Sequence, residues 1–190
     1  MKELVFLLEE QSAKIFLSII ISKLQNPYPV RYIVFDGKQD LEKNISRKLK
    51  AYCNPNAVFI ILRDQDSGDC LAIKNRLVNE CFTSGKKSFL VRIACHELET
   101  FYLADLKAVE KAYCKPIGKF QNNKKYRIPD FLENPKCELK KICPEYREID
   151  GARKIAPYID ITNIRSTSFK NLVNGIQKLI IQFKEIDAYE

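Results

Sequence analysis

Short runs of apolar residues, each followed by polar or acidic residues, recur along the first half of the chain. They occupy residues 4–8, 31–35, 57–62 and 88–95. Apolar runs of this length are typical of strands that are buried on both faces of a parallel sheet. We therefore expect four strands in this half of the protein.

The segments between these runs carry apolar residues at helical spacing. The first begins after Glu9 and Glu10 and stops before Pro27, and the third extends from Asp69 to about Phe82. Strands that alternate with helices of about 10 to 15 residues predict right-handed βαβ units and a parallel sheet covered by helices on both faces. The expected fold class is α/β, a Rossmann-like parallel sheet of about four strands flanked by helices.

The alternation ends near residue 113. Five basic residues and no acidic residue lie between Cys114 and Ile128, and aromatic residues are interleaved with them. This pattern fits an irregular basic insertion that contacts nucleic acid, and it fits equally a solvated, partly mobile loop. A long final helix has an apolar face that packs on the core or on a partner, which leaves a homodimer open. The predicted division is 1–113 for the α/β core, 114–150 for the insertion and 151–190 for a C-terminal helical segment.

Composition narrows the class of protein. Apolar residues make up 46% of the chain and charged residues 29%, which is ordinary for a globular protein. No apolar run reaches the roughly 18 residues that span a bilayer, and the N-terminal run is too short for a signal peptide, so we expect a cytoplasmic protein with no membrane contact. The net charge of +8 favours an anionic partner, nucleic acid first. With His96 as the only histidine and no CxxC pair among seven cysteines, a zinc site is not indicated.

Candidate acidic ligands follow the first, third and fourth predicted strands. Because the carboxyl ends of parallel strands meet at one edge of the sheet, these side chains can converge there. Carboxylate oxygens are the ligands that Mg²⁺ prefers. The alternative is that they form turns, with Asp69 as the N-cap of the next helix. The candidate ligands of a bound Mg²⁺ or Mn²⁺ are Glu9, Glu10, Asp64, Asp66, Asp69, Glu97 and Glu99.

Several basic residues are candidates for phosphate contacts. Lys38 follows Gly37 after the second strand, but the loop lacks the other residues of a Walker A loop. Arg165 stands beside Ser166 and Ser168 before the final helix, where a phosphate could bind the helix N-terminus. Each could instead be a solvated side chain. The full candidate set is Lys38, Lys74, Arg165, Lys124, Lys125 and Arg127.

Five segments together resemble a known family. They are LLEEQSAKIFL from Leu7, DGKQDL from Asp36, ILRDQDSGDC from Ile61, RIACHELETFYLAD from Arg92 and NIRSTSF from Asn163. In this order they resemble the TOPRIM domain of topoisomerases, primases and OLD-type nucleases. More narrowly, they resemble a small stand-alone TOPRIM-like bacterial family of unassigned function. Members of that family are commonly encoded beside a P-loop ATPase of the ABC or SMC-like kind.

The resemblance implies a site and an activity. The TOPRIM glutamate falls on Glu9, and the Asp-x-Asp pair falls on Asp64 and Asp66, so these residues are expected to bind Mg²⁺ and to carry catalysis. Two departures are clear: Glu10 replaces the usual glycine, and Ala13 replaces a second carboxylate common in OLD-type nucleases. The implied function is a metal-dependent nuclease acting on DNA or RNA, the effector of an ATPase–nuclease antiphage system.

Two other readings stand beside the nuclease. The same fold could be a non-catalytic module that binds nucleic acid or an ATPase partner, and the two departures favour this alternative. A flavodoxin-like or other nucleotide-binding protein is a weaker reading, because no glycine-rich phosphate loop follows the first strand.

Overall fold

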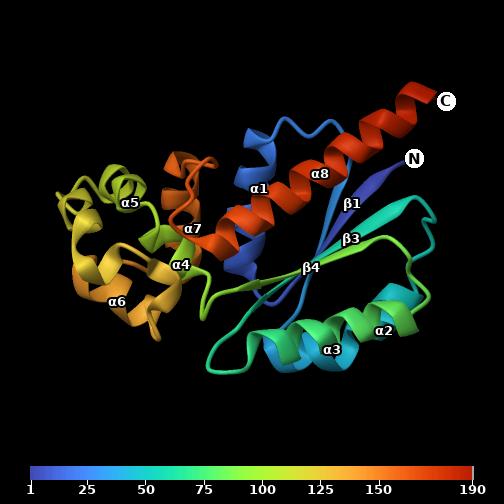
Figure 1. The fold of residues 1–190 in the computed structure, drawn as a ribbon, viewed down its shortest axis with the longest axis horizontal. Coiled ribbons are helices and arrows are strands. Elements are labelled where there is room, and N and C mark those ends of the chain that lie inside the picture. Colours follow the sequence, from blue (N-terminus) through green and yellow to red (C-terminus); the bar gives the residue numbers. More distant parts are fainter. Residues whose placement is uncertain (190) are drawn as a thin grey trace.

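The computed structural model describes residues 1–189 and shows an α/β fold built on a four-stranded parallel sheet (Figure 1). The strands are β1 (Glu3–Leu8), β2 (Val30–Val34), β3 (Ala57–Asp64) and β4 (Phe89–Ala94), in the order β2-β1-β3-β4. Each pair of neighbours is parallel. The expected four strands and parallel sheet are confirmed, and β3 extends beyond the predicted Leu62 to include Asp64.

Helices cover both faces of the sheet (Figure 1). Helices α2 (Lys38–Lys50) and α3 (Cys70–Thr83) pack on one face, and α1 (Gln11–Lys23) and α8 (Thr167–Tyr189) pack on the other. In β1, Leu4, Phe6 and Leu8 belong to the core cluster of α1, and the intervening Val5 and Leu7 belong to that of α2 and α3. This two-sided burial explains why the strand reads as a continuous apolar run.

The remaining helices gather beyond the end of the sheet (Figure 1). Helix α4 (Glu99–Leu103) follows β4 closely. Helix α5 (Leu106–Tyr113) is capped by Asp105, whose carboxylate accepts a 3.1 Å hydrogen bond from the Ala108 N–H. Three 3-10 helices follow, η1 (Gly118–Asn122), η2 (Lys124–Tyr126) and η3 (Pro129–Phe131). Helices α6 (Pro135–Ile142) and α7 (Glu148–Ile155) and the 3-10 helix η4 (Ala156–Tyr158) complete this group.

Residues 114–150 are thus more ordered than the irregular insertion that we expected. Their buried side chains, among them Tyr126, Leu139 and Tyr146, belong to the same core cluster as α1. Gly151 contributes to this packing, because a side chain there would collide with the ring of Tyr146. Helix α7 crosses the predicted boundary at residue 150. The division into three segments stays a prediction.

The long helix α8 packs on the core along its length. Phe169, Leu172 and Ile176 are buried near its start. Further along, Asp187 pairs with Lys2 and accepts a 2.6 Å hydrogen bond from the Tyr28 hydroxyl. This helix is the longest one, yet no helix within residues 1–189 has the apolar length that crossing a membrane requires.

Candidate functional site

The carboxyl ends of the two central strands bring Glu9 and Asp64 together. Strands β1 and β3 are paired, with Leu8 opposite Leu62, so the residues that follow lie side by side. The backbone N–H of Asp64 donates a 3.3 Å hydrogen bond to Oε2 of Glu9. Two residues 55 positions apart in the chain therefore share one edge of the sheet.

Both carboxyl groups have perturbed pKa values. Burial raises the pKa of Asp64 well above its ordinary value, and the nearby charges of Glu9, Glu99 and Glu10 raise it further. Burial also raises the pKa of Glu9, against the opposing effect of the Arg63 guanidinium. Like charges in a desolvated place disfavour ionisation. We call Glu9, Glu10, Asp64 and Glu99 the acid cluster.

Glu99, a member of this cluster, and the nearby Tyr102 are both buried. Glu99 is only 2% exposed, and its Oε1 accepts a 2.8 Å hydrogen bond from the Tyr146 hydroxyl. Burial raises the pKa of Glu99 to about 7. The hydroxyl of Tyr102 is fully buried near Glu99 and Asp64 and has no hydrogen-bond partner in the described part of the chain. A buried hydroxyl without a partner costs free energy, so this position is suited to an additional polar group or a hydrated ion.

The Asp66 carboxylate does not belong to the acid cluster and lies near the cations Lys38 and Arg63 instead. Its Oδ2 accepts a 2.9 Å hydrogen bond from Nζ of Lys38. The backbone of Asp66 is left-handed, with φ of 54°, and its N–H donates a 2.7 Å hydrogen bond to the carbonyl oxygen of His96. Nδ1 of His96, itself left-handed with φ of 59°, lies 3.0 Å from the carbonyl oxygen of Asp66. The loops after β3 and β4 are thus tied to each other.

Arg63 is a buried cation that the sequence analysis did not single out. Its side chain is 6% exposed and forms a 3.0 Å ion pair with Glu42 of α2, and Asp66 lies 3.9 Å away. Its charge opposes the rise in the pKa of Glu9. Alternation along β3 turns Arg63 away from the face to which Asp64 belongs. The signal was present in the sequence as a single charged residue at the end of an apolar run.

Two further candidate metal ligands, Asp69 and Glu97, also accept hydrogen bonds from the backbone. The Asp69 carboxylate accepts a 2.6 Å hydrogen bond from the Ala72 N–H, which makes it the N-cap of α3. Oε2 of Glu97 accepts a 2.7 Å hydrogen bond from the Lys136 N–H at the start of α6. The capping alternative for Asp69 is confirmed, and Glu97 has the similar task of holding the insertion against β4.

The donor set suits a hard divalent cation in its chemistry, because Glu9, Glu10 and Asp64 offer only oxygen atoms. As the side chains lie, however, no group of three or more His, Cys, Asp or Glu residues within the described chain is arranged so that it could hold a metal ion. A cation bound by Glu9 and Asp64 would require Glu10 or Asp66 to turn toward it. Ser12, which donates to Glu10, and Lys38 are the partners that would have to release them.

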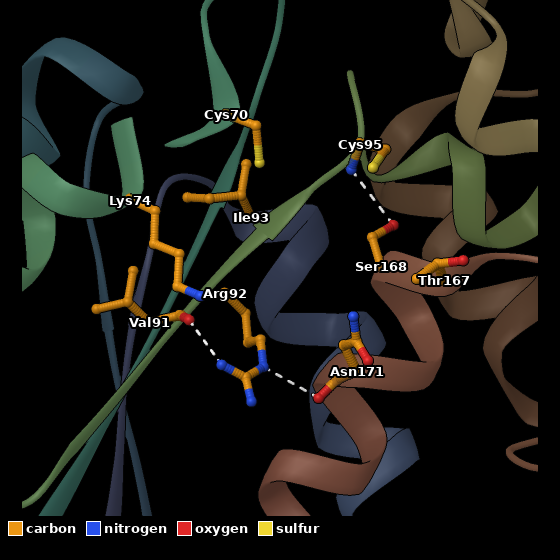
Figure 2. Close-up of a pocket in the computed structure, with 9 residues that line it drawn as sticks. All are labelled: Cys70, Lys74, Val91, Arg92, Ile93, Cys95, Thr167, Ser168 and Asn171. Atoms are coloured by element: carbon orange, nitrogen blue, oxygen red, sulfur yellow. Dashed lines mark hydrogen bonds between the residues drawn. The ribbon is translucent and has the colours of Figure 1, made fainter. Parts of the chain in front are cut away.

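Lys74 lies apart from the acid cluster. It lines a cavity of about 280 Å³ between α3, β4 and α8. Figure 2 shows it reaching from α3 toward β4, where Nε of Arg92 donates a 3.0 Å hydrogen bond to the Asn171 carbonyl oxygen. Cys95 and Ser168 stand at the other end of the same cavity.

At the N-terminus of α8 beside Arg165, where we expected a phosphate site, the backbone N–H groups are already bound by a carboxylate of the chain. The N–H groups of Thr167 and Ser168, at the start of α8, donate hydrogen bonds of 2.7 and 3.1 Å to Oδ2 of Asp130. The helix terminus already holds a carboxylate of the chain, and only the side chain of Arg165 remains for an external anion. The hydroxyl that caps α8 belongs to Ser166, which accepts a 3.1 Å hydrogen bond from the Phe169 N–H.

Comparison with known proteins identifies both a family and a fold. The family described as a domain of unknown function (DUF4276) matches residues 8–177. The C-terminal region of the OLD protein of Xanthomonas campestris pv. campestris, phased with platinum, aligns with a TM-score of 0.52 at 12% identity over 98% of this chain and 97% of that one. The determination phased with iodine gives a TM-score of 0.51 at 13% identity, over 96% and 97%. No curated protein matches the chain. At such low identity the likeness shows the fold alone, and it confirms the expected α/β fold class.

Proposed function

The chain belongs to the DUF4276 family, and we propose that it is a metal-dependent phosphodiesterase of the TOPRIM type that cleaves DNA or RNA. The observation that carries this proposal is the pairing of Glu9 with Asp64 at the carboxyl edge of adjacent central strands. The fold that the chain shares with the C-terminal region of an OLD protein supports the same reading.

The chemistry follows from the charges. Glu9, Asp64 and Glu10 repel one another when ionised, and a bound Mg²⁺ or Mn²⁺ would remove that cost. When bound, such an ion supplies a polarised phosphoryl oxygen and a more acidic water. Glu9, whose pKa is raised by burial, is suited to accept and return a proton at Oε2. Lys38, once it releases Asp66, would contact the phosphate and stabilise its charge.

The proposed partner is the one that the resemblance to a stand-alone TOPRIM-like family implies. In the solved relative this fold forms the C-terminal region of a longer protein. We propose that a P-loop ATPase of the ABC or SMC-like kind, encoded nearby, is the partner of this chain and that the pair acts in antiphage defence. Co-purification of the chain with the product of a neighbouring ATPase gene would test this pairing.

Cleavage assays test the activity. Purified protein is incubated with Mg²⁺ or Mn²⁺ and with plasmid, single-stranded DNA or RNA. We expect cleavage by the natural protein and loss of cleavage in Glu9→Gln and in the Asp64→Ala, Asp66→Ala double variant. Asp36→Asn is a matched control, because Asp36 is an exposed acid at the same edge of the sheet outside the acid cluster. Full cleavage by the double variant would contradict the proposal.

The non-catalytic module is a second candidate, and two observations favour it. Lys38 neutralises Asp66, and no three acids within residues 1–189 are arranged to hold a metal. Under this alternative the acid cluster would have only a structural role, and the basic residues of the insertion would bind nucleic acid or an ATPase. Calorimetric titration separates the two candidates: absence of Mg²⁺ or Mn²⁺ binding up to roughly millimolar concentration supports the module.

A further inference from the structure

An exposed aromatic ring stands among cations on the insertion. Phe131 is 79% exposed and Ile128 is 48% exposed. Together with Leu132 they line a pocket of about 350 Å³, which Lys124, Lys125 and Arg127 complete. We call this the Phe131 pocket. Exposed apolar residues are ordinary when they are single, but a contiguous apolar patch bordered by polar residues is typical of a binding site.

The backbone on either side of Phe131 is fixed. Gln121 is buried, and its side chain donates to the carbonyl oxygen of Tyr126 at 3.3 Å and accepts from the Leu106 N–H at 2.6 Å. Asp130, the neighbour of Phe131, binds the first N–H groups of α8. The exposure of Phe131 therefore comes from a well-anchored segment rather than from a loose loop.

The cations around the pocket differ in their availability. Nζ of Lys125 lies 2.5 Å from Oε2 of Glu138 and stands over the ring of Tyr126. Lys124 and Arg127 are exposed, and neither forms an ion pair with a residue in the described part of the chain. Two charges are thus free for an external anion, and we expect less from Lys125 than the sequence suggested.

The Phe131 pocket is tied to the acid cluster by short contacts. Oγ of Ser168, which lies 3.4 Å from Oδ1 of Asp130, accepts a 3.3 Å hydrogen bond from the Cys95 N–H. Cys95 directly follows Ala94, which pairs with Asp64 in the register of β3 and β4. The pocket consequently lies at the same end of the sheet as Glu9 and Asp64.

We propose that the Phe131 pocket holds an unpaired base of a single-stranded nucleic acid, stacked on the ring, while Lys124 and Arg127 bind the flanking phosphates. This inference rests on the proposed function and names its substrate class. In a duplex the faces of each base are covered by its neighbours, so a lone exposed ring can stack only on an unpaired or displaced base. Cations spaced around an aromatic platform are the usual means of holding single strands.

The test is a binding measurement without catalysis. Fluorescence anisotropy in EDTA compares a labelled single-stranded oligonucleotide with its duplex. We expect tighter binding of the single strand, a loss of between about 5-fold and about 150-fold in Phe131→Leu, and near-normal binding in Phe131→Tyr, which keeps the ring. Lys124→Gln should lower the dependence of binding on salt. Phe82→Leu is the control, because Phe82 is also exposed but lies on α3.

Two results would overturn the inference: equal affinity for single strand and duplex, or unchanged binding in Phe131→Leu. Because Phe131 is exposed, its variants should fold normally, which thermal unfolding verifies. Binding that depends on Phe131 supports the inference even if the protein never cleaves with Mg²⁺, and such a result counts against the proposed function alone. Either of the two contrary binding results, obtained with a protein that cleaves in a Glu9-dependent manner, overturns the inference and leaves the proposed function standing.

Discussion

Oε2 of Glu9 accepts a hydrogen bond from the backbone N–H of Asp64, not from its side chain. The two carboxylates are therefore held near each other by the main chain, and their mutual repulsion is not relieved by this contact. This arrangement makes the effects of charge removal at the site predictable, because an amide in place of either carboxylate leaves the backbone donor in place.

Asp64→Asn should stabilise the metal-free protein while abolishing its response to metal. Burial and the nearby carboxylates raise the folded-state pKa of Asp64, so stability is lost as the pH rises above the ordinary aspartate pKa, and the amide removes that loss. In EDTA we expect the variant to have a higher free energy of unfolding than the natural protein, with the difference growing as the pH rises. Urea denaturation with and without Mn²⁺ measures both effects. Lower stability of the variant in EDTA would contradict the repulsion.

Lys38→Gln should release the Asp66 carboxylate. The Lys38–Asp66 pair is partly exposed, so its loss should change stability by less than about 1 kcal/mol. Affinity for Mn²⁺ should rise several-fold, whereas affinity for nucleic acid should fall because a phosphate contact is lost. Calorimetry and anisotropy report the two changes, with Lys43→Gln on the same helix as control. Weaker metal binding in Lys38→Gln would show that Asp66 is not a ligand.

Glu99→Gln should flatten the dependence of stability on pH. The pKa of Glu99 is raised from 4.5 to about 7, so the folded state holds a proton that the unfolded state has already released. Stability from this group is therefore greatest below pH 4.5 and declines as pH rises toward 7, by on the order of 3 kcal/mol. The glutamine keeps an acceptor for the Tyr146 hydroxyl. Subtracting variant from natural stability at each pH isolates the effect, and parallel curves would disprove the raised pKa.

Asp130→Ala should loosen the insertion from α8. The carboxylate accepts two N–H groups at a helix N-terminus, a contact worth about 0.5 to 2 kcal/mol. Asp130→Asn retains an acceptor and should lose less. Glu133→Ala is the control, since Glu133 is an exposed acid in the same segment. Thermal unfolding gives the stability, and a larger loss in the control than in Asp130→Ala would contradict the cap.

The strands and their acidic ends were predictable because strands buried on both faces leave a strong apolar signal. The placement of Glu9 beside Asp64 needed one further fact, the adjacency of β1 and β3, which no local pattern specifies. The order β2-β1-β3-β4 comes from packing across the whole chain.

What the sequence could not provide are pairings between distant residues. Lys38 reaches Asp66 from 28 positions away, and Tyr146 reaches Glu99 from 47. Residues 114–150 were read as irregular because their helices are short and their buried residues, such as Tyr126 and Leu139, are spaced without a period. Their order comes from contacts with α4, α5 and α8 that only the folded chain contains.

Asp66 and His96 both have a left-handed backbone and connect the loops after β3 and β4. The Asp66 N–H donates to the His96 carbonyl oxygen, and Nδ1 of His96 contacts the Asp66 carbonyl oxygen. Asp and His adopt a positive φ at lower cost in free energy than most residues, so these contacts add little strain to the folded state. One loop cannot move without also moving the other. A cation that drew Asp66 toward Glu9 would therefore pull on the β4 loop, and through Glu97 on the start of α6. Metal binding at the acid cluster would therefore be coupled to the position of the insertion, so the acid cluster and the Phe131 pocket would respond together to a bound strand.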